Sequence, residues 1–224
     1  MGERVRLRAA DGHELGAYRS EPSGGPRGGV IVLQEIFGVN THIRDVTDGF
    51  AAEGYRALAP ALYDRSSAKD VEMGYTKDDV ARGRMLREEF SWDDTVKDVE
   101  AAMNALRGEG LRVGSVGYCW GGSISFLSAV RLPLDAAVVY YGGQILPYVN
   151  EKERCPLLMH FGKKDASIPA SDVEAIQKAH PRAAVHLYDA DHGFNCDQRA
   201  QYDLASSKLA RERTLAFFAA NLAP

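Results

Sequence analysis

The sequence has few cysteines and no long apolar or basic segment, and each absence argues against a class of protein. Only three cysteines occur among 224 residues, far apart in the chain, which argues against a disulfide scaffold or a zinc site and favours a reducing compartment. No apolar run approaches the ~20 residues that span a bilayer. The formal net charge is −4 and no basic run is present, so neither nucleic acid nor a membrane is an expected partner.

Targeting and cofactor motifs are also lacking. Residues 1–18 are charged throughout, without the apolar core of a secretory signal or the Ser/Thr of a myristoylation signal. No H-E-x-x-H, C-x-x-C or Walker motif occurs, so no metal or organic cofactor is expected. We therefore expect a cytoplasmic protein, a monomer or small homo-oligomer, that folds as one domain over residues 1–224.

Short apolar runs alternate with amphipathic segments along most of the chain. Val5–Arg8 and Glu14–Tyr18 predict an opening β-hairpin. Further strands are predicted at Gly29–Leu33, Tyr55–Ala59, Leu111–Tyr118, Ala136–Tyr141, Pro156–Gly162 and Ala183–Tyr188. Because helical segments lie between these later strands, the pattern predicts an α/β fold: a mostly parallel sheet, helices on both faces, and the hairpin antiparallel at one edge.

Capping residues set the expected helix starts. Asn40 is predicted to cap a helix that ends near Gly54. Two pairs with the spacing of a capping box predict further starts, namely Ser91 with Asp94 and Ser171 with Glu174. Residues 61–90 are the least regular part, although Asp78–Glu89 predicts a helix. Its basic face is either solvated or a binding surface, and it consists of Arg82, Arg84 and Arg87.

Gly117-x-Cys119-x-Gly121 follows an apolar strand and precedes a helical segment. This is the spacing of the nucleophile elbow, G-x-S-x-G, with sulfur in place of oxygen. The residue at the apex of so sharp a turn has strained φ/ψ angles, and side chains two residues away would collide with it, so glycine is needed there. The dipole of the following helix favours a thiolate. The pattern favours a nucleophilic Cys119 over a buried structural cysteine.

A thiol nucleophile needs a base, and the base needs an orienting acceptor. In α/β-hydrolases the chain order is nucleophile, acid, histidine. Asp165 and His192 meet this order, and each lies just past the carboxyl end of a predicted strand. The alternatives are Asp189 or Asp191 as the acid and His42 as the base. The remaining histidines lie in predicted strands, at a helix end or in the hairpin.

The oxyanion of the reaction needs two backbone N–H donors. One is expected from Trp120, the residue after the nucleophile, and the other from Ile36, in the loop after the first buried strand. The same loop contains Glu35. A carboxylate beside an oxyanion would oppose catalysis unless it had another task, so Glu35 either takes part in proton transfer or points away at the surface.

Four segments together resemble the dienelactone hydrolase (carboxymethylenebutenolidase) family: Gln34-Glu-Ile-Phe-Gly38, Gly117-Tyr-Cys-Trp-Gly-Gly122, Tyr140-Tyr-Gly142 and His192-Gly-Phe. The resemblance extends from about Gly28 to Phe218. It implies an α/β-hydrolase fold and hydrolysis of a small lactone or ester through Cys119, His192 and Asp165. It also implies that Glu35 accepts the thiol proton once substrate binds. Residues expected to contact substrate are Phe37, Tyr141, Arg82, Arg84 and Phe194.

One departure from the family concerns arginine. Well-known members hold the substrate carboxylate, and restrain the loop glutamate, with an arginine four residues after the catalytic histidine. Here that position is Cys196. The substitution predicts looser substrate choice and a Glu35 that lies nearer the sulfur, unless Arg199 replaces the missing charge. The alternative functions are a general carboxylesterase or thioesterase and a non-catalytic ligand-binding homologue.

Overall fold

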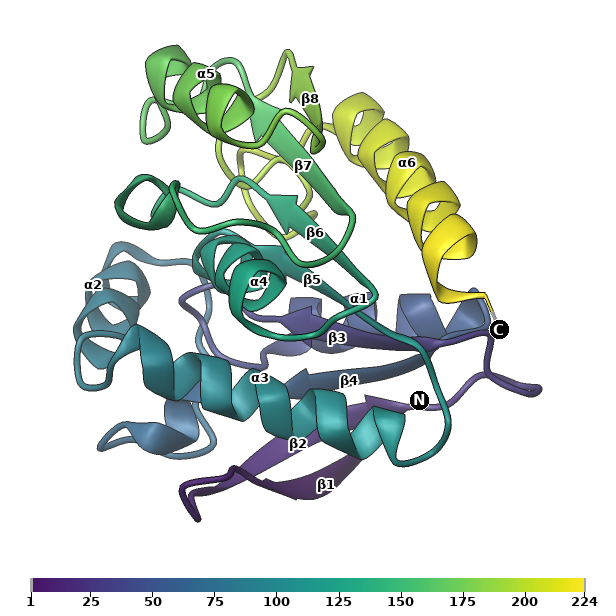
Figure 1. The fold of residues 1–224 in the computed structure, drawn as a ribbon. Helices are drawn as coiled ribbons and strands as arrows, with labels where there is room; N and C mark the ends of the chain where they lie inside the picture. Colours follow the sequence, from purple (N-terminus) through teal and green to yellow (C-terminus); the bar gives the residue numbers. More distant parts are fainter. Residues whose placement is uncertain (1, 224) are drawn as a thin grey trace.

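A computed structural model describes residues 2–223, and its centre is one eight-stranded sheet (Figure 1). The strands are β1 Glu3–Arg8, β2 Glu14–Ser20, β3 Gly29–Leu33, β4 Arg56–Pro60, β5 Val113–Tyr118, β6 Ala136–Tyr140, β7 Leu157–Gly162 and β8 Ala184–Tyr188. Their spatial order is β1-β2-β4-β3-β5-β6-β7-β8. Strands β3 to β8 pair in parallel, whereas β1 and β2 form an antiparallel hairpin at one edge. The predicted fold class is therefore confirmed.

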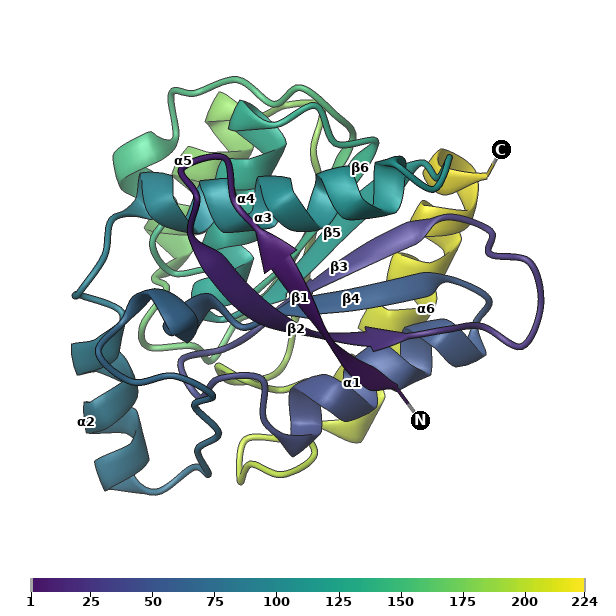
Figure 2. The same cartoon turned by 90° about the horizontal axis from the view of Figure 1, so that it is seen from below.

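Residues 2–223 form six α-helices, namely α1 Thr41–Ala52, α2 Lys77–Leu86, α3 Trp92–Arg107, α4 Trp120–Arg131, α5 Ala170–Ala179 and α6 Leu204–Leu222. Five of them cover the two faces of the sheet, while α2 lies to one side of it (Figure 1). Right-handed crossovers place α3, α4 and α5 on one face, because each of these helices connects a strand to another that lies nearer β8 in the sheet. The connection through α1 runs in the opposite direction, so α1 lies on the other face, which it shares with α6 (Figure 2).

The central strands are buried on both faces, as continuous apolar runs predict for a parallel sheet. Every residue of β3, β5, β6 and β7 is buried. This rigid centre positions the loops that follow the carboxyl ends of the strands, where ligands bind in such sheets. Within residues 2–223, none of the helices combines the length and the apolar character needed to cross a bilayer.

Two of the predicted helix starts are correct and one is wrong. The Asn40 side chain accepts a hydrogen bond from the Ile43 N–H, and Ser91 with Asp94 forms both bonds of a capping box. The predicted box of Ser171 and Glu174 does not form. Helix α5 begins after Pro169 instead, so Ser171 lies within its first turn and bonds the neighbouring Asp172 carboxylate.

Candidate active site

Cys119 stands at the sharp turn between β5 and α4. Its backbone has φ 55° and ψ −116°, a conformation that is strained for a side chain other than glycine. The Cys119 N–H donates to the Tyr140 carbonyl at 3.0 Å, which holds the strained turn to the neighbouring strand. The thiol is partly exposed, whereas Cys155 and Cys196 are buried.

Close backbone packing explains both glycines of the elbow. A Cβ at position 117 would overlap the carbonyl oxygen of Gly121, and a Cβ at position 121 would overlap the carbonyl oxygen of Leu33. The second contact presses the start of α4 against the end of β3. As a result the two loops that carry the expected oxyanion donors lie side by side.

His192 and Asp165 come from the loops after β8 and β7. The Asp165 Oδ2 atom lies 2.7 Å from His192 Nδ1, and the carboxylate is almost completely buried. Asp165 Oδ1 also accepts a 2.8 Å hydrogen bond from the Ser167 N–H, so the carboxylate has a fixed orientation. Neither alternative acid contacts the ring: Asp191 accepts from the His192 backbone N–H at 2.6 Å, and Asp189 pairs with Lys164.

The imidazole of His192 is stabilised in its charged form. Burial disfavours that charge, but the charge of Cys119 and the hydrogen bond with Asp165 outweigh burial and raise the pKa of His192 to about 10. At the thiols of Cys155 and Cys196 the charged form is destabilised instead. Burial raises the pKa of Cys155 to about 12 and, together with the negative charge of Glu35, raises the pKa of Cys196 to about 11.

The backbone N–H groups of Ile36 and Trp120 are available to a ligand. Neither donates a hydrogen bond to another group within residues 2–223, and Trp120 opens helix α4, where the first N–H groups have no helical acceptor. The Tyr63 hydroxyl lies 3.1 Å from the Ile36 carbonyl, and its ring stacks on Trp120 at 5.4 Å. A single buried tyrosine thus supports both sides of the expected oxyanion hole.

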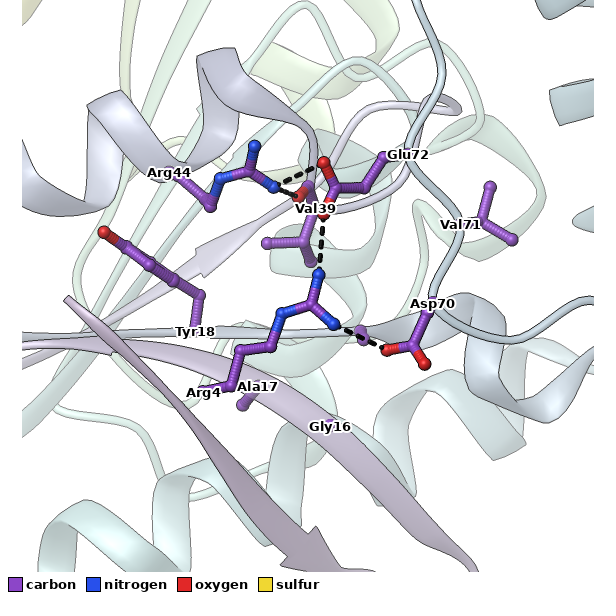
Figure 3. Close-up of a pocket in the computed structure, with 10 residues that line it drawn as sticks. Arg4, Gly16, Ala17, Tyr18, Val39, Arg44, Asp70, Val71 and Glu72 are labelled. Carbon is purple, nitrogen blue, oxygen red and sulfur yellow. Dashed lines mark hydrogen bonds and ion pairs between the residues drawn. The ribbon is translucent and has the colours of Figure 1, made fainter.

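Residues 70–75, here called the strap, hold the Glu35 loop from outside. Gly38 pairs with Glu72, and the Met73 N–H donates to the Phe37 carbonyl at 2.9 Å. Arg4 bonds Asp70 and Glu72, and Arg44 bonds Glu72 as well; Figure 3 shows this cluster. The small cavity of about 50 Å³ beside it has no predicted catalytic residue in its lining. The ion pairs of Arg4 and Arg44 hold the strap in place, and the strap in turn holds the Glu35 loop.

A larger cavity, of about 720 Å³, opens over Cys119 and His192. Ile36, Phe37 and Trp120 also line it, together with three arginines: Arg84 from α2, Arg87 at the C-cap of α2, and Arg199. Helix α2 lies close to the Ile36 loop because residue 83 is glycine, and a Cβ there would overlap the Ile36 carbonyl oxygen. This approach places Arg84 and Arg87 in the lining of the cavity that contains Cys119.

The predicted substrate contacts are only partly brought together. Phe37 and Arg84 line the cavity, but Tyr141 and Phe194 are completely buried and lie outside its lining. The Tyr141 ring packs against His192, with ring centroids 5.0 Å apart. Arg82 is exposed and also lies outside the lining. Residues 84 and 87 share a helix face and residue 82 does not, because neighbours on a helix surface are three or four residues apart.

Glu35 is buried and paired, which decides between the alternatives that the sequence left open for it. Its carboxylate is 1% exposed, which rules out a surface glutamate that points away. Arg199 Nη1 lies 3.0 Å from Glu35 Oε1, and its guanidinium lies over the Phe37 ring at 5.8 Å. Of the two possibilities that Cys196 left open, a Glu35 without a restraining cation and an Arg199 that replaces the missing charge, the structure shows the second. Arg199, seven residues after His192, supplies that cation.

The histidines that were set aside have other partners. His42, the alternative base, is buried outside the cavity that holds Cys119, with its Nδ1 atom 3.3 Å from Asp197 Oδ1. His160 lies 2.8 Å from the Tyr188 hydroxyl, and His180 bonds Glu153 at 2.6 Å.

Arg87 and Gln144, which bond each other at 3.2 Å, line the cavity although no substrate contact was assigned to them. The sequence does contain a signal for Arg87, because it follows Arg84 by three residues and so lies on the same side of the helix.

Comparisons with known proteins show the family of the chain. The dienelactone hydrolase family model matches residues 15–222. A carboxymethylenebutenolidase of Pseudomonas putida is 32% identical over 228 residues, covering 98% of this chain and 97% of its own. A Synechocystis protein assigned as the same enzyme is 36% identical over 229 residues, with 93% of each chain covered.

A solved structure leads to the same family. A Klebsiella pneumoniae protein assigned as a dienelactone hydrolase superposes with a TM-score of 0.81 at 32% identity. The match covers 97% of this chain and 99% of that one. The chain therefore belongs to the dienelactone hydrolase family and is a carboxylic ester hydrolase with the α/β-hydrolase fold.

Proposed function

We propose that the protein opens a lactone or carboxylic ester, with Cys119 as nucleophile, His192 as base and Asp165 as the group that orients His192. The observation that carries the proposal is the 2.7 Å hydrogen bond that His192 Nδ1 donates to Asp165 Oδ2, behind a cavity that His192 shares with Cys119. Nucleophile, base and acid follow one another in the chain order of an α/β-hydrolase. The strained backbone of Cys119 points to the same role.

The raised pKa of His192, about 10, favours an imidazolium at neutral pH, and in the first route of the proposal this imidazolium is paired with the Cys119 thiolate. The Cys119 sulfur attacks the carbonyl carbon, and the electron pair of the C=O bond moves onto oxygen. The N–H groups of Ile36 and Trp120 hold this oxyanion. When the tetrahedral intermediate collapses, the C–O bond breaks and the leaving oxygen takes the proton of His192.

Water then cleaves the thioester that remains. The neutral imidazole of His192 takes a proton from water as its oxygen attacks the thioester carbon. Collapse of the second intermediate breaks the C–S bond and releases the carboxylic acid, so the thiolate and imidazolium are restored. Asp165 keeps Nδ1 protonated throughout, which leaves Nε2 as the nitrogen that exchanges protons.

A second route for the thiol proton involves Glu35. In this route the thiol rests neutral while Arg199 holds the carboxylate at 3.0 Å, and substrate binding releases Glu35 to accept the proton. The unpartnered Oε2 of Glu35 supports this role, because a buried carboxylate oxygen without a hydrogen bond is poised to gain one. Glu35→Gln should slow turnover only if Glu35 accepts the thiol proton, so this variant distinguishes the two routes. We expect a reduction in kcat of about 10- to 1,000-fold.

The substrate is proposed to carry a negative charge. Arg84, Arg87 and Arg199 line the cavity, against the acidic side chains of Glu88 and Asp191. Guanidinium groups bind carboxylates through two parallel hydrogen bonds, which gives both affinity and orientation. A lactone with a carboxylate substituent fits this lining better than a neutral ester does.

A panel of lactones and esters, with and without a carboxylate, tests the proposal. The intact enzyme should hydrolyse the carboxylated lactones with the highest kcat/KM, and Cys119→Ala should lower hydrolysis by about 10³-fold or more. Arg87→Met should lower kcat/KM for the carboxylated substrates alone, by about 10- to 100-fold.

Arg82→Met is the matched control for Arg87→Met, since Arg82 belongs to the helix that Arg87 caps but lies outside the cavity lining. An equal loss in both variants would argue against a carboxylate site. Faster hydrolysis of neutral esters by the intact enzyme would favour a general carboxylesterase, and full activity of Cys119→Ala would exclude the cysteine mechanism.

A further inference from the structure

A second group of reactive side chains lies outside the hydrolytic cavity. His42 belongs to the first turn of α1, and Cys196 and Asp197 belong to the segment that follows His192. One ring nitrogen of His42, the thiol of Cys196 and a carboxylate oxygen of Asp197 all lie within 4.8 Å of one another. The proposed hydrolysis uses none of these three residues.

The hydrogen bonding of His42 is incomplete. The ring is buried, and its Nε2 atom has no hydrogen-bond partner within residues 2–223. Its Nδ1 atom lies 3.3 Å from Asp197 Oδ1, longer than the 2.7–3.2 Å of ordinary N–H···O bonds. In a tetrahedral site whose ligands lie about 2.0–2.1 Å from the metal, two ligand atoms are about 3.3 Å apart. The distance therefore matches two ligands of one ion.

Cys196 supplies the sulfur of the site. Its thiol is free and buried, and it is one of the three groups whose donor atoms lie within 4.8 Å of one another. A thiol binds a cation of this class as the thiolate, so the ion would replace the proton, which passes to solvent.

An ion can reach the site from solvent. His42 and Asp197 both line a second cavity, of about 300 Å³, and the Asp197 side chain is 67% exposed. The donor set is one sulfur, one imidazole nitrogen and one carboxylate oxygen. Calcium and magnesium prefer oxygen ligands, whereas zinc and similar borderline cations take this mixture.

We propose that His42, Cys196 and Asp197 bind a divalent cation of the zinc class, with water in the fourth position on the side of the second cavity. The ion would fix the turn between His192 and Arg199. In that turn the Cys196 N–H donates to the Gly193 carbonyl at 2.9 Å, and the Arg199 N–H donates to the Cys196 carbonyl at 3.1 Å. Metal binding there stabilises the segment that holds Arg199 against Glu35.

Cobalt(II) is the probe, because its bond to a thiolate gives a charge-transfer absorption band that zinc lacks. The experiment uses Cys119→Ser protein, since Cys119 and His192 form another thiol–imidazole pair. Titration with Co²⁺ should give this band with saturation at one equivalent, and Zn²⁺ should displace the cobalt and raise the Tm. Adding Cys155→Ser should leave the band unchanged, whereas adding Cys196→Ser should abolish it.

The exposed ligand provides an independent variant. Asp197→Asn changes a surface side chain, so the fold should persist even if Cys196→Ser unfolds the protein. In the Cys119→Ser protein, Asp197→Asn should weaken Co²⁺ binding by at least about tenfold. The absence of a thiolate–cobalt band in Cys119→Ser protein, or Co²⁺ binding that Asp197→Asn does not weaken, would overturn the proposal.

Discussion

Replacing Arg199 with glutamine removes the cation that pairs with the buried carboxylate of Glu35. Their closest atoms are 3.0 Å apart and the carboxylate is 1% exposed. Opposite charges about 4 Å apart attract by about 4 kcal/mol at an effective dielectric constant of about 20. Removal of one partner of a buried pair commonly costs about 3–5 kcal/mol, because the other charge is left alone. We expect Arg199→Gln to lower the free energy of unfolding by this amount at pH 7.

A double-mutant cycle separates the stranded charge from lost packing. Glu35→Gln removes the carboxylate but keeps the shape of the side chain, so Glu35→Gln/Arg199→Gln should recover most of the lost stability. Urea unfolding of the intact protein, both single variants and the double variant gives the coupling free energy, expected to be about 2 kcal/mol or more. Effects of the two substitutions that add to within about 0.5 kcal/mol would refute the ion pair as a stabilising interaction.

The same four proteins show whether the pair also restrains a proton acceptor. If Arg199 keeps Glu35 from Cys119, Arg199→Gln should make the free enzyme react faster with iodoacetamide at neutral pH, and the double variant should lose that gain. Equal alkylation rates in all four proteins would mean that Glu35 takes no proton from the thiol. Cys119 and His192 would then act as a standing ion pair.

Three further predictions use other parts of the molecule. Limiting iodoacetamide should label Cys119 before Cys155 or Cys196, whose pKa values are raised to about 12 and about 11; peptide mapping that finds Cys155 labelled first would contradict the assignment of the nucleophile. Gly117→Ala should prevent folding or greatly lower the Tm, because its Cβ would overlap the Gly121 carbonyl oxygen, whereas Gly24→Ala, with no atom within 4 Å, should change the Tm little. The folded-state pKa of His192, about 10, lies above its unfolded value of about 6.5, so its contribution to stability is complete below pH 6.5 and is lost as the pH rises toward 10; urea unfolding of intact protein and His192→Gln over this range should show their difference shrinking.

The sheet and the elbow could be predicted because local sequence determines both. Each central strand is a continuous apolar run, and such a run is enough to predict a strand that is buried on both faces of a parallel sheet. The elbow depends on backbone contacts that only glycine permits, so Gly117 and Gly121 mark it directly. The order of Cys119, Asp165 and His192 then follows from the connections between parallel strands.

The region between β4 and α3 was harder to predict because distant partners hold it. The strap depends on Arg4 and Arg44, from β1 and α1, and its residues form no apolar pattern of their own. Helix α2 rests on the fit of Gly83 against the Ile36 loop rather than on a strong apolar stripe. For this reason the basic face of α2 could be recognised in the sequence, but not the choice of Arg84 and Arg87 over Arg82.

Cys196 and Arg199 show why a single position after His192 does not determine which cation reaches Glu35. Two successive backbone turns, from Gly193 to Cys196 and from Cys196 to Arg199, each advance three residues. A side chain one turn later can therefore reach the same buried carboxylate, and Arg199 does so while its guanidinium covers Phe37. Cys196 lies close to His42, although most of the chain separates these two residues in the sequence. Widely spaced cysteines argue against a zinc site in the sequence, yet a site needs its ligands close only in space, and the proposed site would draw them from α1 and the segment after His192. In this chain the arrangement of Cys196 and Arg199 keeps the cation beside Glu35 and leaves a thiol where it can serve as a ligand.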